Sequence, residues 1–217
     1  MFTSSMEIDK RHMSFRILDD PTRDRLQAEL QGLEEKLKIE GIGNTLFSVV
    51  MELVGNAVKA NVKRAYFTEK GFNLKKPEDY EKGLENFGAD YPNIDKERYR
   101  LALEELDLKV DLDIDLDHNR LLIFVQNNTL LLKDEEKRIR AKLAGAMDVK
   151  DVMEFYMHYG DDTEGRGLGL AMTVLLIKDM GFNPDYFRVY HEGDRTIARI
   201  EFPLDANYRP IREQTHS

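Results

Sequence analysis

The chain has 217 residues, of which 41% are hydrophobic and 34% are charged, a balance typical of a globular domain rather than a disordered chain. The formal net charge of -9 argues against a general nucleic-acid or anionic-membrane surface, which needs clustered Lys and Arg. The sequence has no cysteine, which excludes disulfides, thiolate catalysis and sulfur-ligated zinc, and no stretch approaches the roughly 20 apolar residues of a membrane helix. We expect a single cytoplasmic domain over residues 1–217 with neither nucleic acid nor membrane as partner.

The N-terminal half is predicted to be mainly helical. Residues 1–11 read as a loose terminus and residues 14–18 as a short edge strand. Asp20 as cap and Pro21 in the first turn start a helix over residues 20–40, in which leucines recur at helical spacing. A second helix with a broad apolar face begins at about Asn44. Residues 67–107 turn polar and irregular, with short helical patches, and we interpret them as an insertion in the domain.

The C-terminal half mixes strands with helices. Strict alternation over residues 108–116 predicts a strand with three aspartates on a solvent face, Asp111, Asp113 and Asp115, to which we assign no metal. The apolar run that follows predicts a central strand covered on both faces. Helices are then expected over residues 133–143, 149–156 and 169–178, and a closing hairpin over residues 186–202. The polar tail over residues 204–217 is expected to be flexible and to fray. This order of elements predicts an α+β fold, a two-layer α/β sandwich.

One group of polar residues interrupts the apolar face of the second helix. Glu52, Asn56 and Lys59 are spaced by four and three residues and therefore share one helix face. An Asn oxygen is a suitable Mg²⁺ ligand, a carboxylate can orient or deprotonate an attacking water, and a lysine can neutralise phosphate charge. The alternative is a solvated stripe on an amphipathic helix.

A second group is a polar, glycine-rich turn that leads directly into an apolar helix. Gly165, Gly167 and Gly169 would let backbone amides approach phosphate oxygens, and the free N–H groups of the following helix start favour an anion. Arg166 adds positive charge. No G-K-[ST] follows, so the turn is not a P-loop, and it lacks the preceding strand of a dinucleotide fingerprint. The alternative is an ordinary loop before a helix.

Taken together, these residues resemble the GHKL superfamily, which includes histidine kinases, anti-sigma serine kinases, DNA gyrase and MutL. Glu52-x-x-x-Asn56-Ala57-x-Lys59 is similar to its N-box, and Gly165-x-Gly167-Leu168-Gly169-Leu170 is similar to its G2 box. The order of parts also fits over about residues 44–204. The resemblance implies a Bergerat fold, a mixed sheet covered by helices on one face, with ATP and Mg²⁺ as ligands.

The resemblance also implies roles for individual residues. Asn56 would bind Mg²⁺, and Glu52 would be the catalytic residue that activates water or an acceptor. Lys59 would lie near the phosphates, which would be wrapped by Gly165, Arg166, Gly167, Leu168 and Gly169.

Two departures from the family pattern stand out. Asn127 occupies the place of the G1-box Asp that receives the adenine amino group, and the glycines that follow that Asp are missing. An Asn oxygen can still accept one hydrogen bond, but the amide is neutral, so we expect weakened or altered base recognition. The alternative is that Asn127 belongs to a turn that simply ends a strand. None of the five histidines lies in a phospho-acceptor H-box, so autophosphorylation is not expected.

The leading hypothesis is therefore an ATP-binding, histidine kinase-like protein, either a signalling kinase or an ATPase, that couples ATP or ADP occupancy to a protein partner. A catalytically lapsed nucleotide-binding or protein-interaction module is the alternative, and a structural protein with fortuitous motifs ranks last. The leucines of the helix over residues 21–39 could pair two subunits as a homodimer, or they could lie against the domain's own sheet.

Overall fold

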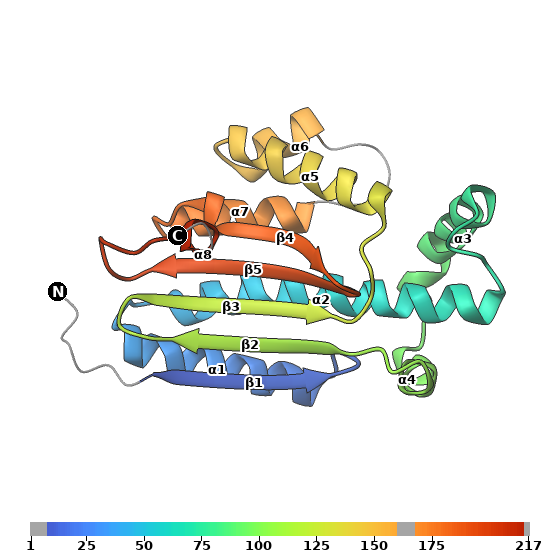
Figure 1. Ribbon diagram of the computed structural model, residues 1–217, viewed down its shortest axis with the longest axis horizontal. Coiled ribbons are helices and arrows are strands. Elements are labelled where there is room, and N and C mark those ends of the chain that lie inside the picture. Colours follow the sequence, from blue (N-terminus) through green and yellow to red (C-terminus); the bar gives the residue numbers. More distant parts are fainter. Residues whose placement is uncertain (1–7, 160–167, 215–217) are drawn as a thin grey trace.

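The computed structural model describes residues 8–159 and 168–214, in which strands and helices build an α+β fold (Figure 1). The strands are β1 (Asp9–Phe15), β2 (Val110–Leu116), β3 (Arg120–Asn127), β4 (Phe187–Glu192) and β5 (Arg195–Pro203). The helices are α1 (Asp20–Leu37), α2 (Ile42–Lys70), α3 (Pro77–Asp90), α4 (Lys96–Glu105), α5 (Lys133–Asp148), α6 (Val152–Tyr159), α7 (Leu168–Asp179) and α8 (Ile211–Gln214), with short 3-10 turns η1 (Tyr91–Asn93) and η2 (Pro184–Tyr186). The fold class predicted from the sequence is confirmed at this level.

The five strands form one open sheet in the order β1-β2-β3-β5-β4. Every hydrogen-bonded pair in it is antiparallel, so the expectation of a mixed sheet is wrong. Strands β3 and β4 do run in the same direction, but β5 lies between them. The reason is the tight β4–β5 hairpin, which places its second strand rather than its first against β3. The central position expected for β3 is confirmed.

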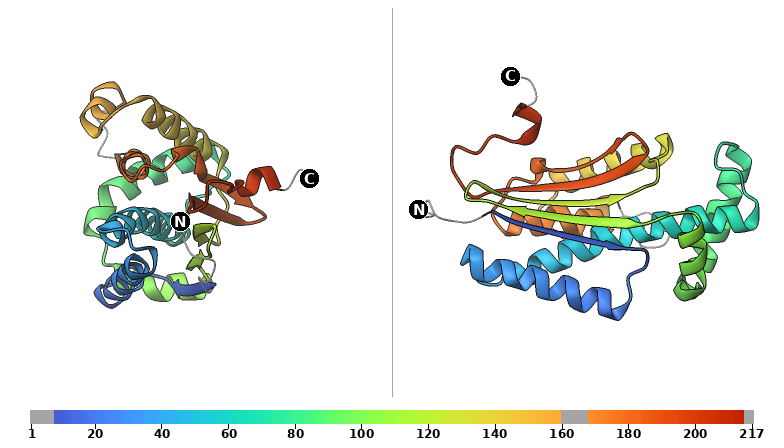
Figure 2. Two further views of the ribbon diagram at one scale, coloured as in Figure 1. Left: turned by 90° about the vertical axis from the view of Figure 1, so that its left-hand side faces the viewer. Right: turned by 60° about the horizontal axis from the view of Figure 1, so that its bottom comes forward.

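Helices α1, α2 and α7 lie on one face of the sheet (Figure 2). Helix α1 starts at the N-cap Asp19, one residue before the expected cap, because the Asp19 carboxylate accepts a hydrogen bond of 3.0 Å from the backbone N–H of Thr22. Its four inward leucines are at most 1% exposed: Leu26, Leu30, Leu33 and Leu37. They are buried where α1 packs along α2, so this apolar face is used within the protein.

Strand β1 begins at Asp9, inside the segment expected to be a loose terminus, although its place at the edge of the sheet is as predicted. Only Met13 in β1 is fully buried, so the strand lacks the apolar alternation that would reveal it. Instead, Arg11 fastens β1 to α1. Its guanidinium pairs with Asp9 at 2.7 Å and with Glu29 at 3.0 Å.

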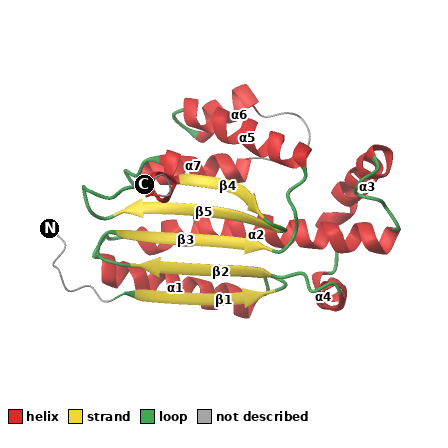
Figure 3. Ribbon diagram, viewed as in Figure 1, coloured by secondary structure: helices red, strands yellow, loops and turns green. Residues whose placement is uncertain are grey.

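The insertion extends the molecule past the end of the sheet. Figures 1 and 3 show α2 running beyond the strands, with α3 and α4 beside its extension. With 29 residues, α2 is about 43 Å long at 1.5 Å per residue. Aromatic residues pack around this part of α2: the rings of Tyr66 and Phe87 meet edge to face at 5.4 Å, and Phe67 is 1% exposed. The insertion is thus a packed helical unit rather than an irregular loop.

The opposite face of the sheet carries charged side chains that are paired. Asp113 accepts a hydrogen bond of 2.9 Å from Gln126 and lies 2.7 Å from the His12 ring nitrogen, so the aspartates of β2 are half-buried rather than fully solvent-facing. The C-terminal segment, expected to fray, is held on this face by Glu201, which is 2% exposed and accepts hydrogen bonds from Tyr208 and the Ile211 backbone.

Candidate functional site

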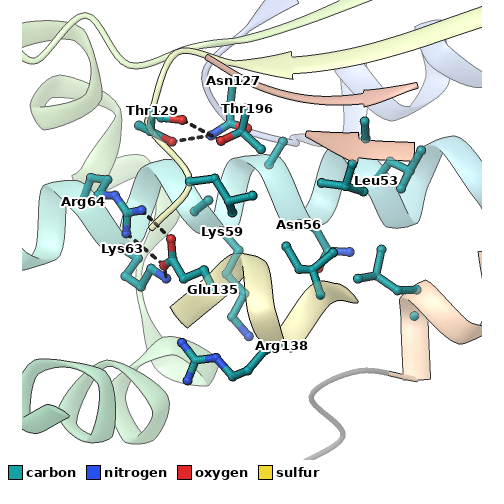
Figure 4. A pocket seen from close by; sticks show the side chains of 18 of the residues that line it. Leu53, Asn56, Lys59, Lys63, Arg64, Asn127, Thr129, Glu135, Arg138 and Thr196 are labelled. Atoms are coloured by element: carbon teal, nitrogen blue, oxygen red, sulfur yellow. Dashed lines mark hydrogen bonds and ion pairs between the residues drawn. The ribbon is translucent and has the colours of Figure 1, made fainter. Parts of the chain in front are cut away.

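A cavity of about 750 Å³ opens beside α2, between the ends of β3, β4 and β5, helices α5 and α7, and the insertion (Figure 4). This volume falls in the range of small-molecule sites. Five of the predicted site residues line it: Glu52, Asn56, Lys59, Asn127 and Gly169. The fold therefore brings together, around one cavity, residues from three separate stretches of the sequence.

The remaining predicted residues belong to the glycine turn. Gly165, Arg166 and Gly167 lie outside the described residues. Leu168 is the first residue of α7, and Gly169 follows it at the cavity wall. A Cβ atom on Gly169 would lie 1.7 Å from Oε1 of Glu52, which is far inside any allowed contact. Glycine is therefore required at this position for the Glu52 carboxylate to lie where it does.

Glu52 and Asn56 are joined side by side on α2. The Asn56 Nδ2 group donates a hydrogen bond of 2.7 Å to Oε1 of Glu52, as the spacing of four residues allows. The amide oxygen of Asn56 thereby keeps its acceptor capacity for another partner.

This pair supplies oxygen ligands suited to magnesium. Among the described residues, no three His, Asp or Glu side chains gather to hold a metal ion. Mg²⁺ bound with a nucleotide commonly takes only one or two protein oxygens, together with phosphate oxygens and waters. Glu52 and Asn56 fit that pattern and no more elaborate metal site.

Lys59 connects the middle of the cavity to the insertion. Its ammonium lies 4.6 Å from the centre of the Tyr91 ring in η1, a cation–π distance. Burial raises the pKa of the Tyr91 hydroxyl, so that ring stays neutral. The insertion therefore forms part of the cavity wall, which the sequence alone does not indicate.

Asn127 ends β3 inside a buried hydrogen-bond network. It is 4% exposed, and its Nδ2 group donates both to Asn61 Oδ1, at 3.2 Å, and to the Thr129 hydroxyl. Asn61 in turn donates 2.9 Å to the backbone carbonyl of Lys109, and the Thr196 hydroxyl donates 2.7 Å to the carbonyl of Thr129. Turning the Asn127 amide over would set its Oδ1 against the Oδ1 of Asn61, which can only accept, so the network selects this orientation.

This network leaves two polar groups for a ligand. Both N–H bonds of the Asn127 amide are used, which leaves its Oδ1 as an acceptor, and the Thr129 hydroxyl keeps its own hydrogen as a donor. Asn127 and Thr129 both line the cavity. The cavity wall therefore presents an acceptor beside a donor. Asn61 and Thr196 were not identified from the sequence, because nothing local marks them.

A charged cluster closes the end of the cavity nearest the insertion (Figure 4). The Glu135 carboxylate of α5 accepts hydrogen bonds from Lys63 and, at 2.8 Å, from Arg64, and these side chains are only 11% to 13% exposed. Burial alone would raise the pKa of Glu135, but the Arg64 hydrogen bond and the Lys63 charge outweigh it and lower that pKa to about 2. Arg138 donates 3.0 Å to the Tyr80 hydroxyl beside them.

Basic side chains outnumber acidic ones around the cavity. Its described lining contains five basic residues, Lys59, Lys63, Arg64, Arg138 and Lys142, and two acidic ones, Glu52 and Glu135. In a chain of net charge -9, this local excess favours an anionic ligand. The sequence offers one signal for it, since Lys63 follows Lys59 by four residues on the same helix face.

Comparisons with known proteins give little further guidance. No family model matches the chain, and no solved structure matches it. An uncharacterised protein of Treponema pallidum (strain Nichols) is 35% identical over 155 residues, which are 71% of this chain and 30% of that protein. The chain thus spans less than a third of the relative's length. Within the described residues, no helix has both the length and the apolar character needed to cross a membrane.

Proposed function

We propose that the cavity binds ATP with Mg²⁺ and that the chain is an ATP-binding protein of histidine kinase-like, Bergerat type. One observation carries the proposal: Glu52 is bonded to Asn56 and lies against Gly169, at the start of α7, on the same cavity that Asn127 and Thr129 line. A phosphate- and metal-binding end and a base-binding wall are thereby joined in one site of suitable size.

The phosphate end uses α2 and α7. The first N–H groups of α7 have no partner within the helix, and its positive dipole end favours an anion. Asn56 would offer its amide oxygen to Mg²⁺, which neutralises phosphate charge when bound. The Glu52 carboxylate would orient or deprotonate a water or an acceptor hydroxyl.

The base wall matches adenine. Adenine presents an amino donor next to ring-nitrogen acceptors, whereas guanine has a carbonyl oxygen in place of that amino group. Asn127 Oδ1 would accept from the amino group, and the Thr129 hydroxyl would donate to a ring nitrogen. We therefore propose that the site distinguishes ATP from GTP even though Asn127 is neutral.

The test is a thermal-shift comparison of ATP, ADP and GTP, each with and without Mg²⁺. Ligands that bind only the folded state raise the melting temperature with concentration. ATP with Mg²⁺ is expected to raise it most, GTP to raise it little, and removal of Mg²⁺ to reduce the ATP effect. Equal shifts for ATP and GTP would contradict the base wall, and no shift for any nucleotide would contradict the site.

A nucleotide-binding module without turnover is the second candidate. It is favoured by the neutral Asn127 and by the lack of an H-box in the sequence. Incubation with labelled ATP, alone and with candidate protein partners, separates the two. Phosphate release or transfer that is lost in Glu52→Gln supports an enzyme, whereas binding without turnover supports the module.

A further inference from the structure

Positive charge is in excess where the insertion meets α5. Lys63, Arg64 and Arg138 lie together, and Glu135 is the one carboxylate among the described residues that bonds to any of them. Arg138 donates instead to the hydroxyl of Tyr80. Burial raises the pKa of that hydroxyl, so Tyr80 is neutral and offsets no charge. The group therefore carries more positive than negative charge, with Lys63 and Arg64 largely buried and Arg138 exposed.

This group lies away from the proposed phosphate end. Lys63 and Arg64 follow Asn56 by seven and eight residues on α2, which is about 10 to 12 Å along the helix axis. Asn61, which accepts a hydrogen bond from the proposed base-binding residue Asn127, lies between Asn56 and Lys63 in the helix. If a nucleotide binds with its base on Asn127 and its phosphates on Asn56, the basic cluster lies on the side of the base opposite to those phosphates.

The surroundings favour a charged ligand held out of bulk water. The insertion adds apolar residues to the same cavity, Leu84, Phe87 and Tyr91 among them. Uncompensated charge in such a place is costly, and a bound anion removes that cost. Burial lowers the pKa of Lys63, and the negative charge of Glu135 opposes that shift.

We propose that Lys63, Arg64 and Arg138 form a second anion site that binds the phosphate group of a small phosphorylated ligand other than the bound nucleotide. Arginine suits this role because its planar fork can give two parallel hydrogen bonds to one phosphate. Glu135 positions Lys63 and Arg64 and does not contact the ligand. The site goes beyond the nucleotide proposal and does not depend on it.

The experiment is a calorimetric and thermal-shift titration of the full chain with inorganic phosphate, at ionic strength matched with sodium chloride. Wild type is compared with Arg138→Gln and with the control Arg140→Gln. Arg140 lies two residues later on α5, is 68% exposed and pairs with Glu136 at 2.6 Å outside the cavity lining. We expect phosphate to bind wild type and Arg140→Gln equally, and Arg138→Gln at least about tenfold more weakly.

Circular dichroism shows whether Arg138→Gln folds. If it does not, Lys63→Met is the second variant, and Lys63→Met should lose phosphate binding to a similar extent. No phosphate effect beyond that of chloride, or an equal loss in Arg140→Gln, would overturn the proposal. Competition between phosphate and ATP, with both weakened by Arg138→Gln, would also overturn it, because the cluster would then hold the nucleotide's own phosphates. Phosphate binding without any ATP binding supports this site while refuting the nucleotide proposal.

Discussion

The substitution Gly169→Ala should disturb the proposed site without unfolding the protein, because the added methyl group meets a single movable side chain, that of Glu52. The new Cβ would lie 1.7 Å from Glu52 Oε1, whereas ordinary contacts begin at 3.4 Å, so the carboxylate must move by about 1.7 Å. That movement breaks its hydrogen bond with Asn56, the proposed metal ligand, and so releases the Asn56 amide from the orientation it has in this site.

The expected cost to stability is small. Placing alanine instead of glycine in a helix stabilises it by roughly 0.5 to 1 kcal/mol. Forcing the partly exposed Glu52 into another rotamer costs about 0.5 to 1.5 kcal/mol. The free energy of unfolding should therefore change by less than about 1 kcal/mol. A lost contact to a charged group is worth about 1.5 to 3 kcal/mol, so Mg-ATP affinity should fall roughly 10- to 100-fold.

Urea denaturation measures the stability and calorimetry measures the affinity. Gly55→Ala is the matched control, because it lies next to Asn56 on α2 and an added Cβ there meets no atom within 4 Å. It should leave Mg-ATP binding unchanged. A second control is Gly169→Ala in a Glu52→Ala background, where no carboxylate remains to be displaced, so the extra loss of affinity should nearly vanish.

Two results would refute this reasoning. Gly169→Ala could bind Mg-ATP as tightly as wild type, which would show that the Glu52 position does not matter to the ligand. Alternatively, it could weaken binding equally with and without Glu52, which would mean that the methyl group acts on the ligand directly.

Three further substitutions test other parts of the structure. Because the pKa of Glu135 is lowered from 4.5 to about 2, its ionised form stabilises the fold by roughly 3 kcal/mol above pH 4.5. This stabilisation is lost as the pH falls from 4.5 toward 2. In Glu135→Gln, the free energy of unfolding measured in urea should therefore depend less on pH between 4.5 and 2. Asn127→Ala strands the buried oxygen of Asn61 and should lower the free energy of unfolding by about 1 to 3 kcal/mol in urea. Tyr208→Phe removes a hydrogen bond to buried Glu201 and should speed amide exchange in residues 204–214, whereas unchanged exchange would contradict this anchor.

Local patterns in the sequence predicted the elements that have a strong apolar period. The leucines of α1 and the alternation of β2 both lie where those periods place them. The start of strand β1 at Asp9 was not predicted because Met13 is its one buried residue and the residues before it are polar or charged. The antiparallel sheet also could not be read locally, since it depends on which strand of the β4–β5 hairpin meets β3.

The residues of the site likewise fall into those that a local sequence pattern predicts and those that only the fold brings together. Glu52 and Asn56 could be found because they share a helix face within one turn. Asn61 meets Asn127 across 66 residues of chain, and Lys63 meets Glu135 across 72. Rules of helix spacing relate residues only three or four positions apart. The contacts of Asn61 and Lys63 form because the sheet and α5 pack over α2. The contacts that build the base wall and the charged cluster were therefore visible only in the structure, although the family resemblance had already singled out Asn127.

The central claim is that this cavity holds Mg-ATP through Asn56, and calorimetry of wild type, Asn56→Ala and Asn44→Ala tests it most directly. Asn44 lies on the same helix, is exposed and does not line the cavity, so it controls for the substitution itself. We predict micromolar or tighter binding to wild type and Asn44→Ala and a loss of at least about tenfold in Asn56→Ala. Absence of binding to wild type, or equal binding by all three proteins, would contradict the account.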